Sequence, residues 1–184
     1  MNCRLTFLLI LIPALSLAAT ATGKVTVESP SAKQKDNSGV VVWFEPIAGK
    51  PDWKPAAAPV MLHKNKTFLP HVLPIVVGTK VAFPNKDPFF HNAFSNYDAQ
   101  IFDVGLHAPG TTRDFTFTRP GVVRVFCNIH PNMSAVILVL STPYFAVSDA
   151  AGNLTLPVLP PGEYRQQVFH ERVAADALKA LERR

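Results

Sequence analysis

The feature that most restricts the fold of this sequence is a series of short apolar runs, rich in β-branched and aromatic residues and bounded by Pro, Gly and polar residues. Such runs are typical of strands, and a spacing of roughly 8–12 residues between them is the pattern of an antiparallel sandwich or barrel. The runs lie at residues 39–44, 71–77, 80–83, 113–117, 121–126 and 134–140. Four prolines between positions 46 and 59 exclude a long helix there. The sequence therefore predicts an all-β fold.

The end of the chain continues this pattern and then changes it. Two apolar runs around a turn at residues 151–153 predict a hairpin, and residues 165–169 predict a last strand. Residues 171–181 alone have helical spacing, with Val173, Ala177, Leu178 and Leu181 on one side. We expect an extra C-terminal β segment followed by a short terminal helix.

The beginning of the chain has the layout of a secretory signal peptide. Arg4 precedes an apolar run over residues 5–17, and Ala19-Thr20-Ala21 supplies small residues in an A-x-A pattern. A membrane anchor is the alternative, but the run is shorter than the roughly 20 residues that a span needs. We expect residues 1–21 to be removed and the protein to be periplasmic. No second apolar segment follows, so no membrane span is expected in the mature chain.

Charge and motifs argue against several classes of function. The 184 residues carry a formal net charge of +5, without the long basic run that a nucleic-acid partner would require. The sequence contains no G-x-S-x-G and no H-E-x-x-H motif, and no paired carboxylates lie near a histidine. We expect neither nucleic-acid binding nor an enzyme.

The residues that carry chemistry lie at the end of the apolar run 121–126. Cys127, His130 and Met133 follow it within one short loop, and His91 lies upstream in a segment rich in phenylalanine. Two His, one Cys and a weak axial Met are the ligands of blue-copper electron-transfer sites. Sulfur stabilises Cu(I), whereas imidazole suits both Cu(I) and Cu(II). A metal site also explains why an exported chain would keep one unpaired cysteine.

Each of these residues also has a simpler interpretation. Cys127 can be a small buried hydrophobe, and Met133 can fill space in the core. The combination of all four residues favours a metal site. The remaining histidines, His63, His107 and His170, are expected to be exposed or locally bonded side chains, and His71 is left open.

Two segments, 85–95 (NKDPFFHNAFS) and 119–133 (RPGVVRVFCNIHPNM), resemble the cupredoxins, the family of plastocyanin, azurin and amicyanin. The Cys-x2-His-Pro-x-Met loop is similar to that of amicyanin, and the chain looks like bacterial plastocyanin-like proteins labelled methylamine utilization protein. The resemblance covers residues 65–142. It implies that His91, Cys127 and His130 are equatorial ligands of one copper ion and that Met133 is axial. It also implies that Asn92 ties the two ligand loops together and donates its backbone N–H to the Cys127 sulfur.

The resemblance implies a fold and a function for the whole chain. We expect a cupredoxin-like Greek-key β-sandwich divided into a signal peptide (1–21), N-terminal strands with a proline-rich loop (22–64), the cupredoxin core (65–142) and a C-terminal extension (143–184). The extension resembles the carboxypeptidase regulatory-like sandwich in its D-x-x-G-x-L and L-P-P-G-E-Y motifs, although its strands can equally lengthen the cupredoxin sheets, which we slightly prefer. The expected function is single-electron transfer with a c-type cytochrome or a periplasmic dehydrogenase. A copper-binding and delivery module is the alternative, and a metal-free sandwich is a third hypothesis.

Overall fold

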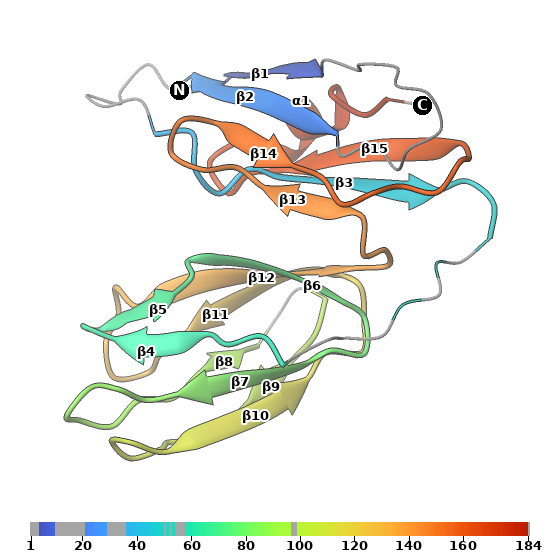
Figure 1. Ribbon diagram of the computed structural model, residues 1–184. Helices are drawn as coiled ribbons and strands as arrows, with labels where there is room; N and C mark the ends of the chain where they lie inside the picture. Colours follow the sequence, from blue (N-terminus) through green and yellow to red (C-terminus); the bar gives the residue numbers. More distant parts are fainter. Residues whose placement is uncertain are drawn as a thin grey trace. The chain divides into compact units, whose positions relative to one another are not determined.

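A computed structural model describes residues 4–9, 21–28, 36–49, 51, 53, 58–96 and 99–183. The chain forms two compact units, each with its own apolar core. The first unit combines the two ends of the chain, Met1–Pro51 and Thr142–Arg184, and the second is the continuous segment Asp52–Ser141. Figure 1 shows that almost all regular structure in both units is β-strand.

In the described part of the unit Asp52–Ser141 there are nine strands; Figure 1 shows how they are arranged. They are β4 (Leu62–Lys64), β5 (Thr67–Leu69), β6 (Val72–Val76), β7 (Lys80–Pro84), β8 (Phe94–Ser95), β9 (Phe102–Asp103), β10 (Thr112–Thr116), β11 (Gly121–Phe126) and β12 (Ser134–Leu140). One sheet has the order β6-β12-β11-β8-β9, in which β6 runs parallel to β12. The strands β10 and β7 form an antiparallel pair, as do β4 and β5.

The core of this unit is apolar and rich in aromatic rings. It contains Phe68, Phe83, Phe102 and Phe117, together with Met61 and the inward residues of β11 and β12. Cys127 and Met133 belong to the same buried cluster. Two of the four residues predicted to carry chemistry are therefore anchored in the core.

The other unit consists of β1 (Arg4–Leu9), β2 (Thr22–Glu28), β3 (Val41–Pro46), β13 (Phe145–Val147), β14 (Asn153–Thr155), β15 (Tyr164–Phe169) and α1 (Ala175–Lys179). Its two sheets have the orders β1-β2-β14 and β13-β3-β15. Val173 is buried in the core of this unit, and Ala177, Leu178 and Leu181 pack against it. The predicted terminal helix is thus present but shorter than the pattern at 171–181, and the predicted side packs against the core although no residue of α1 itself is fully buried.

The expected turn at 151–153 forms: the N–H of Gly152 donates to the carbonyl of Asp149 (2.9 Å), and the N–H of Asp149 donates to the carbonyl of Asn153 (3.0 Å). Beyond the turn the two strands separate, because β13 pairs with β3 and β14 with β2. The strands β13 and β14 have three residues each, whereas their partners β3 and β2 have six and seven. The preferred expectation that the strands after residue 142 lengthen the sheets of the segment 65–142 is wrong, because their partner strands lie in the first unit.

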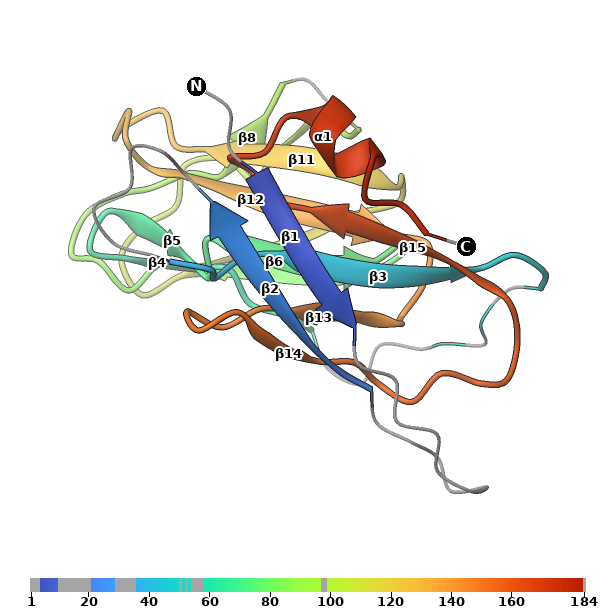
Figure 2. The ribbon, with the colours of Figure 1, turned by 90° about the horizontal axis from the view of Figure 1, so that it is seen from above.

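The segment predicted to be a signal peptide is described only in part. Arg4–Leu9 forms β1, an edge strand that lies antiparallel beside β2 (Figure 2). Residues 1–3 and 10–20, which include most of the apolar run and the Ala19-Thr20 part of the expected cleavage motif, lie outside the described residues. Because β1 is an edge strand, the pairing of β2 with β14 does not depend on it.

Among the residues that the structure describes, no helix has the length and apolar character needed to cross a bilayer.

Candidate metal centre

The antiparallel ladder of β11 and β12 positions three of the predicted ligands. The register runs to the pair Phe126↔Ser134, so residues 127–133 form the connecting loop. Cys127 donates its N–H to the carbonyl of Met133 (3.2 Å), and Met133 donates its N–H to the carbonyl of His130 (2.9 Å). These bonds fold the loop back on itself. Cys127 and Met133 are consequently buried, while His130 is half-buried.

His91 reaches the same place from the segment between β7 and β8. Its backbone pairs with His107 through two hydrogen bonds, in which each N–H donates to the other residue's carbonyl (3.2 and 2.8 Å). The side chain of His91 is completely buried. Asn92, the next residue, accepts the backbone N–H of Asn128 on its Oδ1 at 2.8 Å. Asn92 therefore joins the two ligand loops, as the family resemblance implied.

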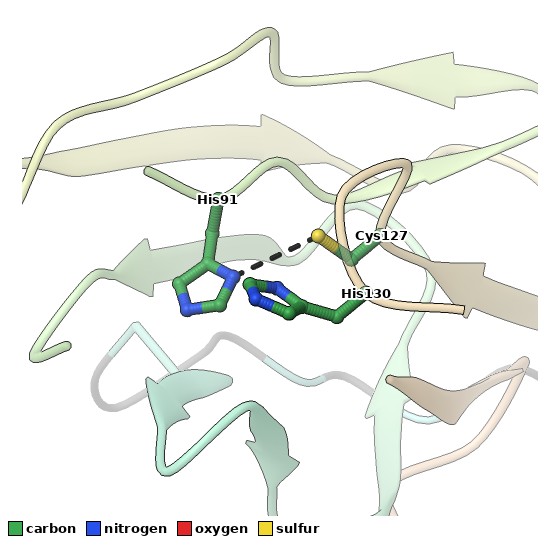
Figure 3. A group of neighbouring side chains, drawn as sticks. All are labelled: His91, Cys127 and His130. Atoms are coloured by element: carbon green, nitrogen blue, oxygen red, sulfur yellow. Dashed lines mark hydrogen bonds between the residues drawn. The ribbon is translucent and has the colours of Figure 1, made fainter. Parts of the chain in front are cut away.

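Figure 3 shows His91, Cys127 and His130 pointing toward one another. The His91 Nδ1 lies 3.7 Å from the Cys127 Sγ, and one ligand atom from each of the three residues lies within 4.8 Å of the others. The buried Nδ1 of His130 has no hydrogen-bond partner among the described residues. One thiol and two imidazoles at this separation are a donor set that fits copper. Met133 lies buried at the end of the same loop.

Hydrogen bonds fix the side of His91 that faces away from Cys127. Its Nε2 lies 2.8 Å from the carboxylate of Asp87, which also accepts the backbone N–H groups of Asn65 (2.6 Å) and Lys66 (2.9 Å). Desolvation by burial would raise the pKa of Asp87, but the hydrogen bonds from Lys66, His91 and Asn65 outweigh it and lower that pKa. Desolvation, with the nearby charges of His91 and Lys66, lowers the pKa of His130. The imidazole of His130 is thus suited to remain a neutral donor.

Aromatic and apolar side chains surround the outer part of the site. The Phe89 ring lies 5.2 Å from the ring of His91 and 5.3 Å from that of His130, measured between centroids. The Lys66 Nζ lies 5.5 Å from the centroid of Phe89. Phe90 and Ile129 are 49% and 45% exposed. The half-buried His130 is therefore bordered by the Phe89 ring and by its exposed chain neighbour Ile129.

Comparison with known proteins gives this arrangement a family. The chain is 31% identical over 141 residues to the chloroplastic plastocyanin of Silene latifolia subsp. alba, and the match covers 67% of this chain and 85% of that protein. The chain belongs to the cupredoxin family. Copper is the cofactor of this plastocyanin-like cupredoxin, and its general function is electron transfer. No protein-family model matches the sequence.

Solved cupredoxin structures are also similar to parts of the chain. A copper-containing nitrite reductase from Thermus scotoductus is 29% identical and matches 52% of this chain and 25% of its own (TM-score 0.44). A purple cupredoxin from Nitrosopumilus maritimus is 25% identical and matches 44% of this chain and 96% of its own (TM-score 0.40). An oxidized amicyanin variant is 17% identical and matches 53% of this chain and 99% of its own (TM-score 0.43).

Sequence reasoning did not predict the burial of three histidines of this cupredoxin. All three histidines that we expected to be exposed or locally bonded, His63, His107 and His170, are buried. For His107 the second alternative holds, because its Nδ1 lies 3.3 Å from the carbonyl of Gly105, whereas His63 is neither exposed nor locally bonded. His63 packs against His91 (5.5 Å between ring centroids) and His107 (4.9 Å), and neither of its ring nitrogens has a hydrogen-bond partner among the described residues. The alternation of buried Met61 and His63 with Leu62 and Lys64 is the signal that would have placed His63 in the core.

The buried His63 predicts a loss of stability in acid. Desolvation, with His107 and His91 adding like charge, lowers the pKa of His63 to about 3, whereas an unfolded chain takes up this proton near pH 6.5. The stability contributed by neutral His63 is therefore complete above about pH 6.5 and is lost as the pH falls toward 3, by at most about 1.4 kcal/mol per pH unit.

We expect the variant His63→Phe to flatten this dependence. In urea unfolding of the copper-free protein, its free energy of unfolding should fall less between about pH 7 and pH 4.5 than that of the wild type. Equal slopes for the two proteins would contradict the assignment of the acid sensitivity to His63.

Proposed function

We propose that this cupredoxin is an exported electron carrier whose single copper ion is held by His91, Cys127 and His130, with Met133 as a weak axial ligand. The observation that carries the proposal is the convergence of three donor atoms within 4.8 Å of one another, from two loops that are far apart in the sequence. The orphaned Nδ1 of His130 supports it, because a buried polar atom without a partner is costly unless a ligand occupies it.

The chain's own residues prepare the site for rapid electron transfer. When bound, copper supplies one-electron chemistry by alternating between Cu(I) and Cu(II). Cys127 and His91 are buried and keep water away from the donors. The loop bonds of Met133 and the bond between Asn92 and Asn128 hold the donors in place. A site fixed in this way needs little rearrangement when the electron arrives or leaves.

Copper delivery is the second candidate function. A delivery protein has to release its ion to a partner, which is easiest from exposed Met and His ligands. Here two of the three donors are buried and one is a thiol. The burial favours a carrier that keeps its copper through many cycles, and the same reasoning favours a carrier over a catalyst that must admit a substrate.

The proposed location and partner follow from the sequence and from the surface near His130. The signal-like residues 1–21 support export to the periplasm, where c-type cytochromes and dehydrogenases are suitable partners. The exposed Ile129, next to His130 in the chain, and the Phe89 ring near that of His130 suit a small and short-lived contact. Lys66, above Phe89, adds a positive charge that favours an acidic partner.

We predict that Cys127→Ser abolishes the intense visible absorption of the copper-loaded protein completely, because that band arises from charge transfer between thiolate and copper. Absorption spectra of both proteins with equal copper test this. Asn132→Ser, an exposed change in the same loop, is the matched control and should stay coloured. A coloured Cys127→Ser variant would exclude Cys127 as a ligand.

We predict that Met133→Gln keeps the copper but lowers its reduction potential, since the axial ligand is long and weak and tunes the site more than it holds the ion. Redox titration measures the potential, and metal analysis measures retention. Met61→Leu is the control, because Met61 is equally buried in the same core. Loss of copper from Met133→Gln would rule out an axial role.

We predict that Pro131→Glu slows electron exchange without changing the copper spectrum, because a charge beside the His130 edge opposes close approach. Electron self-exchange, measured by NMR on mixtures of oxidised and reduced protein, needs no natural partner. Thr118→Glu, just beyond β10 and away from the site, is the control for the added charge. If both variants exchange electrons at the wild-type rate, electrons do not leave through His130.

A further inference from the structure

We propose that Asp87 is a positioning residue of the copper centre, which holds the His91 ring by its far nitrogen, connects it to the β4–β5 turn and lowers the reduction potential of the copper. The inference rests on the proposed function, in which His91 is a copper ligand. The inference is drawn from the hydrogen bonds of the Asp87 carboxylate, and the identity of the copper ligands alone does not lead to it.

The geometry assigns a separate task to each nitrogen of His91. The Nε2 lies 2.8 Å from the Asp87 Oδ2, and the Nδ1 faces the Cys127 Sγ at 3.7 Å. Only a protonated Nε2 can donate to the carboxylate, and in a neutral ring this leaves the lone pair on Nδ1. The carboxylate thereby selects the tautomer whose free nitrogen points to the metal position.

The Asp87 carboxylate is itself held on its other side. It accepts the backbone N–H groups of Asn65 and Lys66, the two residues of the turn between β4 and β5. Both have positive φ (55° and 59°), as in a tight two-residue hairpin turn, which aims their N–H groups at one acceptor. The backbone of Asp87 is fixed too, because its N–H donates to the Asn85 Oδ1 at 3.0 Å. The carboxylate therefore cannot turn away from His91 without losing several bonds.

This connection has an electrostatic consequence. A buried carboxylate that accepts a ligand's N–H makes the imidazole a stronger donor, and its negative charge favours the more highly charged Cu(II) over Cu(I). Both effects lower the reduction potential. The competing interpretation is that Asp87 only caps the turn, and it predicts a change in stability without a change in potential.

The test compares Asp87→Asn with Asp103→Asn in the full-length protein. Asparagine keeps the size of the side chain but has no charge and one acceptor oxygen in place of two. Asp103 is an exposed aspartate in β9 whose Oδ1 also accepts a backbone N–H, from Gly105 at 2.8 Å. The variant Asp103→Asn therefore controls for the loss of a carboxylate charge that accepts a backbone N–H.

In Asp87→Asn we expect the ratio of Cu(I) to Cu(II) affinity to increase about tenfold, which raises the reduction potential by about 59 mV for one electron. The control should keep the wild-type potential. An unchanged potential in Asp87→Asn, with a lowered urea midpoint, would show that Asp87 is only a turn cap and would overturn the proposal.

A second measurement avoids copper altogether. In the copper-free wild type, proton–nitrogen correlation spectra of the imidazole groups should show His91 protonated at Nε2, with a hydrogen-bonded N–H that is lost in Asp87→Asn. A wild-type His91 protonated at Nδ1 would overturn the proposal even if the copper site is correct. Failure of the proposed function is distinguishable, because it would appear as a wild-type protein without the thiolate band.

Discussion

The burial of the two strands β11 and β12 is the constraint on which the metal centre depends. Their ladder is fixed by alternate side chains that pack in the core, and a shift by one residue would turn Val123 and Val125 out of it. The same register sets the first and last residues of the ligand loop. Cys127 and Met133 therefore reach the site because the core requires this pairing, not because the loop is rigid by itself.

The second ligand loop is joined to this ladder by polar bonds. The backbone pair of His91 and His107, and the bond from Asn128 to Asn92, satisfy buried groups while they bring the two loops together. Burying polar groups is costly unless each has a partner. The nitrogens of His63 and the Nδ1 of His130 are two of several exceptions among the described residues, and for His130 a bound metal would supply the missing partner.

The sequence predicted those features that depend on local pattern. The apolar runs at 121–126 and 134–140 coincide with β11 and β12, because their side chains alternate or are continuously apolar. It did not predict which strands pair over long distances. For example, β14 pairs with β2 and not with β13, the strand before it in the sequence. This pairing depends on how much surface each possible partner strand buries, and not on the turn between β13 and β14.

The interior histidines show a further limit of the sequence. His63 is followed by Lys64 and Lys66, which suggest a charged surface and outweighed the weaker signal of its alternation with Met61. The structure shows that its side chain is buried. Similarly, Asp87 looks like an ordinary loop residue until the positions of His91 and of the β4–β5 turn are known. Four ligands could be proposed from their residue types and spacing, and the family resemblance implied the role of Asn92, whereas the contacts of Asp87 could not be proposed.

The central claim is that Cys127 and the two histidines hold one copper ion as a thiolate centre. The most direct measurement is a titration of the purified, copper-free protein with Cu(II), followed by its visible absorption. The account predicts an intense charge-transfer band that grows linearly and saturates at one copper per chain. Two results together would contradict it. The protein would bind copper with only weak absorption, and the Cys127 thiol would still react with thiol reagents after the protein has been unfolded and then refolded in the presence of copper.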